Sequence, residues 1–141
     1  MITEKYVSFE TANLLKEKDF PQDPYMCNTV YTSRGKFSNN AKSFCHNVAL
    51  FNQCGVKPVS YSMAPTLQMA MDWLRVEHNL FIQPTVGETD GKTWYDFDII
   101  PVNGRVIYWK SVENLPETVE CDSPEEACEI AIKYCLENLI K

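Results

Sequence analysis

The chain has 141 residues, of which 45% are hydrophobic and 12% aromatic, and its net charge is −6. This composition is typical of one globular domain whose core needs neither a metal nor a disulfide, and it excludes a disordered chain. No run approaches the ~18 apolar residues of a membrane span, and the first ten residues lack the basic and apolar regions of a signal peptide. We therefore expect a cytoplasmic protein.

The acidic charge is concentrated at the end of the chain. Residues 1–110 carry 11 basic and 11 acidic side chains, whereas residues 111–141 carry 8 acidic and 2 basic ones. Because carboxylates repel phosphate backbones, this end disfavours nucleic acid as a partner.

The six cysteines show no C-x-x-C pair, and the sequence contains only two histidines. This spacing argues against zinc and disulfide frameworks and fits a reducing compartment. Cys128 and Cys135 are seven residues apart on an expected helix, where we predict that both are small buried hydrophobic side chains. The sequence predicts no metal site and no cofactor.

The first 60 residues predict a helix followed by a strand. The helix is expected to begin after Ser8, a good N-cap, and to end near Lys18. Residues 25–32 are rich in β-branched and aromatic side chains, which is typical of a strand. The following segments are a turn (33–40), a helix or a loop with a short strand (41–54), and a short strand (59–62).

The central helix of the fold is predicted by APTLQMAMDWLRVEHN, residues 64–79. Pro65 is expected in its first turn and Asn79 at its exit. Apolar residues, Val76 among them, surround most of the helix, so we expect it to be covered on more than one side. The narrow polar stripe consists of Gln68, Asp72 and Arg75.

Three antiparallel strands are expected next, over residues 80–86, 94–101 and 105–110. Asp90-Gly91 predicts a hairpin loop over 87–92, and Asn103-Gly104 predicts a two-residue turn. Counting outward from the second turn predicts which residues of the two flanking strands pair. The predicted pairs are Val102 with Arg105, Ile100 with Ile107, Ile99 with Tyr108, and Asp98 with Trp109.

The last helix is signalled by Ser123-Pro124-Glu125-Glu126. Ser123 is the expected N-cap, Pro124 the first-turn residue and Glu126 the partner in a capping box. The expected buried face consists of Ala127, Cys128, Ala131, Ile132, Cys135 and Leu139.

The predicted fold class is α+β. An N-terminal helix and strand precede a core of a helix, a three-stranded antiparallel sheet and a helix (αβββα). We expect a single domain, 1–141, with residues 1–60 as an N-terminal layer and residues 61–141 as the core.

The middle strand carries the candidate site. Tyr95, Phe97 and Ile99 share the expected core face, whereas Trp94 and the two aspartates lie on the other. Two tryptophans beside two carboxylates are typical of a binding surface. The two aspartates also fit a metal-dependent or acid–base enzyme, and a further alternative is that residues 1–60 cover this face as a third layer. The candidate binding residues are Trp94, Asp96, Asp98, Ile107 and Trp109.

Other chemistry has weaker support. The order helix, three strands, helix is also that of double-stranded RNA-binding domains, which grip phosphates with lysines at the start of the last helix. Here that start carries carboxylates, so RNA binding is disfavoured. Cys45 and His46 are adjacent and point apart on any regular element, although Cys45 can still meet His78 in space. Nucleotide, dinucleotide and hydrolase motifs are missing, and we predict no catalytic residue.

Three strings span most of the chain in order: VSFETANLLKEKDF, SMAPTLQMAMDWLRVEHNLFI and SPEEACEIAIKYCLENLI. They resemble a family of small uncharacterised proteins of gut Bacteroidales and of their phages and prophages. The sharpest part is APT…WLR…H followed by a strand, and residues 33–57 are not part of the resemblance. It implies a phage or mobile-element accessory protein in the cytoplasm and brings no catalytic residue or cofactor.

The favoured function is therefore a non-enzymatic protein-binding module whose partner is a host or phage protein. A small metal-dependent enzyme using Asp96 and Asp98 is the first alternative. A homo-oligomer, in which a second copy covers the apolar central helix, is a further possibility.

Overall fold

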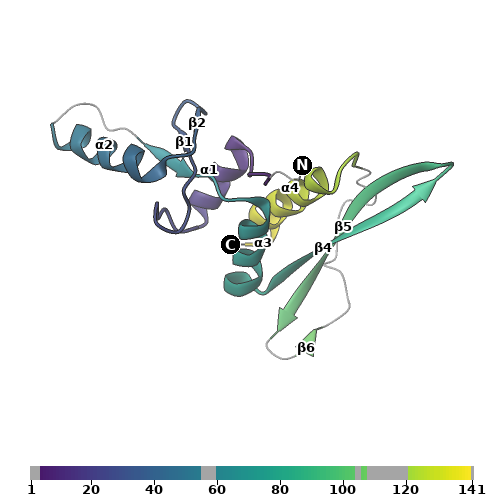
Figure 1. The fold of residues 1–141 in the computed structure, drawn as a ribbon. Helices are drawn as coiled ribbons and strands as arrows, with labels where there is room; N and C mark the ends of the chain where they lie inside the picture. Colours follow the sequence, from purple (N-terminus) through teal and green to yellow (C-terminus); the bar gives the residue numbers. More distant parts are fainter. Residues whose placement is uncertain (1–3, 55–59, 104–105, 108–120, 141) are drawn as a thin grey trace. The chain divides into compact units, whose positions relative to one another are not determined.

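The structure is a computed structural model that describes residues 4–54, 60–103, 106–107 and 121–140 (Figure 1). It is an α+β protein with antiparallel sheets, as predicted. The chain forms two compact units, residues 4–66 and residues 67–141. The prediction of a single domain with an N-terminal layer stays a prediction.

The N-terminal unit contains two helices and a three-stranded antiparallel sheet with the order β2-β1-β3. Its elements are α1 (Phe9–Glu17), β1 (Val30–Thr32), β2 (Phe37–Ser38), α2 (Ala41–Gln53) and β3 (Tyr61–Met63). The Ser8 side chain accepts a hydrogen bond from the Thr11 backbone N–H at 3.2 Å, which confirms the predicted N-cap.

The structure corrects two predicted segments of this unit and decides a third that the sequence left open. The predicted turn over 33–40 contains the short strand β2, which pairs with β1. The strand expected over 25–32 begins only at Val30, because the Asp23 carbonyl accepts from Met26 and Cys27 and closes a turn instead. Tyr25 is consequently 82% exposed. The ambiguous segment 41–54 is a helix, α2, whose N-cap is Asn40.

The C-terminal unit has the predicted order of helix, three antiparallel strands and helix. Its elements are α3 (Leu67–His78), β4 (Leu80–Thr89), β5 (Lys92–Asn103), β6 (Val106–Ile107), α4 (Pro124–Tyr134) and the π-helical segment η1 (Cys135–Leu139). The strand order is β4-β5-β6. Helix α4 packs against β4 and β5, and α3 packs against β4 and α4.

Alternation along β5 places Phe97 and Ile99 in the core as predicted, whereas Ile100, on the other face, is also buried at 5% exposure. Phe97 is 5% exposed and Ile99 is fully buried, and Ile82 lies opposite Ile99 on β4. Tyr95 is half-buried, whereas Tyr108 lies outside the described residues. The apolar side of the β4–β5 pair is therefore the core side.

Helix α3 corrects two expectations. It begins at Leu67 rather than at Pro65, because the Pro65 carbonyl accepts from the Val7 N–H at 3.0 Å and the backbone is still extended there. Its fully covered side is also narrower than expected. The buried residues are Leu67, Ala70 and Leu74, and Val76 is 61% exposed.

The first hairpin is tighter than expected. Asp90 and Gly91 have φ angles of 52° and 77°, and Thr89 pairs with Lys92, so the connection is a two-residue turn. The loop predicted over residues 87–92 is therefore too long, because Asp90 and Gly91 alone connect the strands and β4 continues to Thr89.

The second hairpin has a different register. Val102 pairs with Ile107 instead of Arg105, because Asn103 is still in β5 and pairs with Val106. The predicted pair of Ile100 with Ile107 is therefore wrong by two residues. A shift of two keeps each strand position on its predicted face, whereas a shift of one would not. The predicted pairs that involve residues 108 and 109 lie outside the described residues.

Ser123 is the N-cap of the last helix as predicted, but the Glu126 carboxylate accepts from the residue before the cap and not from the Ser123 N–H of the predicted capping box. The Ser123 hydroxyl accepts from the Glu126 N–H at 3.1 Å, and the Glu126 carboxylate accepts from the Asp122 N–H at 3.3 Å. The buried face differs at one position, where Leu136 is buried and Leu139 only half-buried. The wider π-helical turn of η1 rotates the face and explains this change.

Cys135 on this face makes stability depend on alkaline pH. Burial raises the pKa of its thiol to about 12. Above pH 9 the thiol of the unfolded chain loses its proton while that of the folded chain keeps it, so rising pH favours unfolding. We expect the free energy of unfolding to fall more steeply from about pH 9 to about pH 11 than in Cys135→Ala, by up to about 1.4 kcal/mol per pH unit.

Urea unfolding at several pH values measures this difference. Cys54→Ala, which removes an exposed thiol, is the matched control and should keep the wild-type slope. Equal slopes in the wild type and in Cys135→Ala would contradict the assignment.

Candidate functional site

The predicted site residues of β5 lie on one face of the sheet. Trp94, Asp96 and Asp98 alternate with the core residues, and each is half-buried. Ile107 lies in β6, where it pairs with Val102. Trp109 lies outside the described residues. The structure therefore brings together the part of the predicted surface that belongs to β5.

The indole of Trp94 lies directly over a glycine of the neighbouring strand. Gly87 is its partner in the β4–β5 register, and a Cβ atom added there would lie 2.0 Å from Cζ2 of Trp94. The indole Nε1–H donates to the Thr89 hydroxyl at 3.0 Å. An aromatic ring over a strand glycine replaces the missing side-chain packing, so contact and hydrogen bond together fix the ring.

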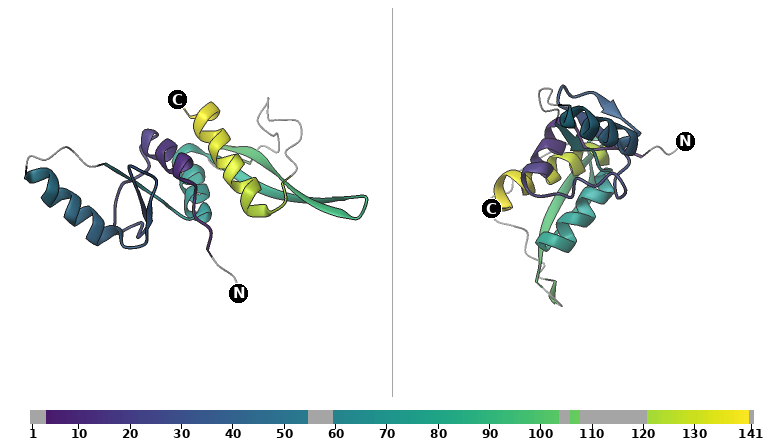
Figure 2. Two further views of the ribbon diagram at one scale, coloured as in Figure 1. Left: turned by 90° about the horizontal axis from the view of Figure 1, so that it is seen from above. Right: turned by 90° about the vertical axis from the view of Figure 1, so that its left-hand side faces the viewer.

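The end of the β4–β5 pair that carries the hairpin turn extends past α4 as a two-stranded ribbon (Figure 2). Val86, on the face opposite to Trp94, is 65% exposed there. On its other edge β5 pairs with Cys121, which precedes the first residue of α4 by three positions. The Tyr95 N–H donates to the Cys121 carbonyl at 3.0 Å, and the Cys121 N–H donates to the Tyr95 carbonyl at 2.8 Å.

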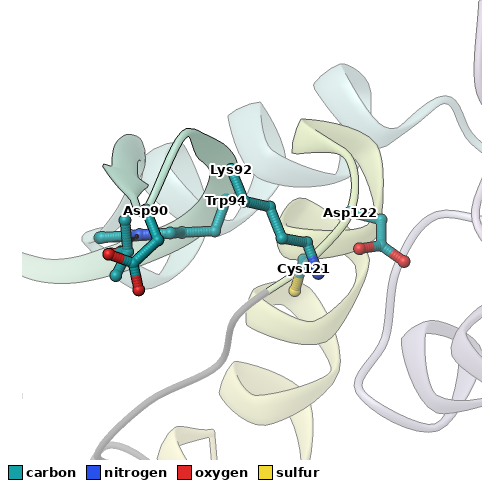
Figure 3. Close-up of a pocket in the computed structure, with 6 residues that line it drawn as sticks. Asp90, Lys92, Trp94, Cys121 and Asp122 are labelled. Carbon is teal, nitrogen blue, oxygen red and sulfur yellow. Dashed lines mark hydrogen bonds between the residues drawn. The ribbon is translucent and has the colours of Figure 1, made fainter.

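A hollow of about 410 Å³ opens beside Trp94. Figure 3 shows Asp90 and the indole on one side of it, Cys121 and Asp122 on the other, and Lys92 extending toward Cys121. The residues that line it are Thr89, Asp90, Lys92, Trp94, Cys121 and Asp122.

The surroundings of this hollow are negatively charged. Burial raises the pKa of the Cys121 thiol, and the carboxylates of Glu126, Asp96 and Asp122 raise it further. The side chain is therefore a neutral thiol at neutral pH and not an activated nucleophile. The same carboxylates make the space beside Cys121 favourable for a cation.

The sequence analysis missed most of the residues around the hollow. The backbone pairing of Cys121 with Tyr95 brings Cys121 and Asp122 to β5, and this pairing has no local sequence signal. The contact between Gly87 and Trp94 did have a signal. A two-residue turn at Asp90-Gly91 pairs residue 89 with 92, and counting outward pairs 87 with 94.

The two aspartates of β5 do not form a larger cluster of ligands. Asp96 Oδ1 accepts from the Phe97 N–H at 2.7 Å, and Asp98 lies two residues farther on the same face. In the parts of the chain that the structure describes, no group of three His, Cys, Asp or Glu side chains is placed to hold a metal ion.

Cys45 lacks the surroundings of a catalytic cysteine. Burial raises the pKa of its thiol, and a hydrogen bond with the Tyr61 side chain only partly offsets this effect. Its neighbour His46 is exposed. The ring of His78 packs edge-on against Trp73, with the two centroids 4.7 Å apart.

The chain matches no protein-family model, no curated protein and no solved structure. The resemblance to proteins of gut Bacteroidales and their phages stays a prediction. Among the residues described, no helix has the length and apolar character needed to cross a bilayer.

Proposed function

We propose that this protein is a non-enzymatic protein-binding module, a phage-type or mobile-element accessory protein that acts in the cytoplasm on a host or phage protein. Its binding surface is the face of β5 that carries Trp94, Asp96 and Asp98, with Ile107 and Trp109 as further members. The supporting observation is the fixed, half-exposed indole of Trp94 on a ribbon that extends past α4.

The ribbon has features that hold its shape without a core of its own. A two-stranded hairpin is marginally stable in water. Here the two-residue turn, the packing of Trp94 over Gly87 and the pairing of Tyr95 with Cys121 all stabilise the extended part. A rigid tryptophan provides a large contact area at a low entropic cost, and tryptophan is enriched among the residues that dominate binding energy.

Affinity capture tests this proposal. Tagged wild type, Trp94→Ala and Val86→Ala are incubated with lysate of a gut Bacteroidales strain, and retained proteins are quantified by mass spectrometry. Val86→Ala is the matched control because Val86 lies on the opposite face of the same ribbon. We expect a partner that wild type and Val86→Ala retain and that Trp94→Ala loses.

Equal recovery with Trp94→Ala, at an unchanged melting temperature, would contradict the proposal. If Trp94→Ala unfolds, the lost packing of the indole on Gly87 is a sufficient cause, and a binding variant that keeps this packing is required. Charge reversal at Asp98, on the same face of β5 (Asp98→Lys), then replaces it as the binding variant.

A metal-dependent enzyme remains the second candidate because Asp96 and Asp98 project from one strand face, with Cα atoms about 7 Å apart. A ligand that binds only the folded state raises the melting temperature. A rise with Mg²⁺, Mn²⁺ or Ca²⁺ in the wild type and not in Asp96→Asn would favour this candidate, and unchanged melting counts against it.

A further inference from the structure

The hollow beside Trp94 has walls from separate segments that the backbone holds in place. Thr89 ends β4, Asp90 lies in the hairpin turn, Lys92 and Trp94 belong to β5, and Cys121 lies before α4. The paired hydrogen bonds between Tyr95 and Cys121 join the last wall to β5. At about 410 Å³ the hollow is within the ~300–1,000 Å³ range of small-ligand pockets and has room for one long side chain.

One wall is an aromatic ring whose position is fixed before anything binds. Gly87 supports the indole of Trp94, and Thr89 accepts its Nε1–H. Indole faces attract cations more strongly than other aromatic side chains do, and a preorganised ring loses little entropy on binding.

The charges around the hollow also favour a cation. Asp90 and Asp122 line it, and Asp96 and Glu126 lie close enough to Cys121 to act on its thiol. Lys92 is the one basic residue of the lining that the structure describes. An anion would have to approach these carboxylates, whereas a cation from outside would compete with the Lys92 ammonium.

We propose that this hollow receives an arginine side chain of the partner protein. The proposal rests on the proposed function and specifies the chemistry of the partner. A planar guanidinium can stack on the Trp94 indole and donate hydrogen bonds to the carboxylates of Asp90 and Asp122, which a lysine ammonium cannot do together with stacking. Lys92 occupies part of this site in the free protein and is displaced on binding.

The test is an NMR titration of the full chain with N-acetyl-L-arginine amide. The readout is the Trp94 indole Nε1–H signal, assigned by its loss in Trp94→Phe. N-acetyl-L-citrulline amide, which has nearly the same shape without the charge, is the control ligand. We expect a saturable shift with the arginine compound that weakens at high salt and is largely absent with the citrulline compound.

Two charge variants give expectations of opposite sign. Asp122→Asn removes an attractive charge and should raise the Kd by about threefold or more, and Lys92→Gln removes the competing cation and should lower it. Both side chains are exposed, so neither change is expected to disturb the fold. A lower Kd for Asp122→Asn and a higher Kd for Lys92→Gln would indicate an anion site. Equal shifts with the arginine and citrulline compounds would indicate that charge is not recognised. Either result, or no shift with the arginine compound, overturns the proposal.

These outcomes separate this inference from the proposed function. If the arginine compound binds but Trp94→Ala still captures the partner, the hollow is a cation site and the binding-module proposal fails. If Trp94→Ala loses the partner but the arginine compound does not bind, the binding surface stands and the arginine proposal fails.

Discussion

Replacing Gly87 with alanine is expected to lower the free energy of unfolding by about 1–3 kcal/mol, because the new Cβ atom would lie 2.0 Å from Cζ2 of Trp94. To relieve this overlap the indole has to move away from Gly87, which weakens its packing and its hydrogen bond to Thr89. Urea unfolding followed by circular dichroism measures the loss.

A double-mutant cycle separates this cause from a general effect of alanine on the strand. In a Trp94→Ala background the clash no longer exists, so Gly87→Ala should change stability by less than about 0.5 kcal/mol. A loss of the same size in both backgrounds would mean that the indole does not lie over Gly87.

Replacing Ile99 with alanine is expected to cost about 2–5 kcal/mol, because Ile99 is fully buried and its removal leaves a cavity. Its neighbour Asp98 points to the other face of β5 and is only half-buried. Asp98→Ala is the matched control and should cost less than about 1 kcal/mol. Denaturant unfolding of the two variants compares the faces directly.

Comparable losses for Ile99→Ala and Asp98→Ala would contradict the assignment of one core face and one outer face. They would instead favour the hypothesis that residues 1–60 cover the aspartates as a third layer.

Local signals in the sequence predict local structure well. Ser8 and Ser123 cap their helices because a hydroxyl before a helix satisfies a free N–H group within a few residues. Asp90 and Gly91 form a tight turn because both adopt positive φ angles that few other residues accept. These features depend on nothing distant in the chain.

The second hairpin shows where such signals fail. Asn103-Gly104 is a strong turn signal, but Asn103 pairs with Val106 and stays in β5. The Val102 N–H donates to the carbonyl of Asn79 at 2.6 Å, where the chain leaves α3 with a positive φ angle. This contact between residues far apart in the sequence extends the hydrogen bonding of β5 to its end, and no local sequence pattern predicts it.

One part of the candidate site could be predicted from local sequence and another part could not. Alternation along β5 predicts that Trp94, Asp96 and Asp98 share a face, because strand side chains alternate. The hollow could not be predicted, since Cys121 is 26 residues from Tyr95 in the sequence. Only tertiary pairing brings the two segments together.

The central claim is that the Trp94 face binds a protein, and the most direct measurement is the Kd of the captured partner for purified wild type, Trp94→Ala and Val86→Ala. The prediction is a Kd at least about tenfold higher for Trp94→Ala, which corresponds to about 1.4 kcal/mol, and one within about twofold of wild type for Val86→Ala. The same Kd for Trp94→Ala and the wild type, with both proteins folded, would contradict it.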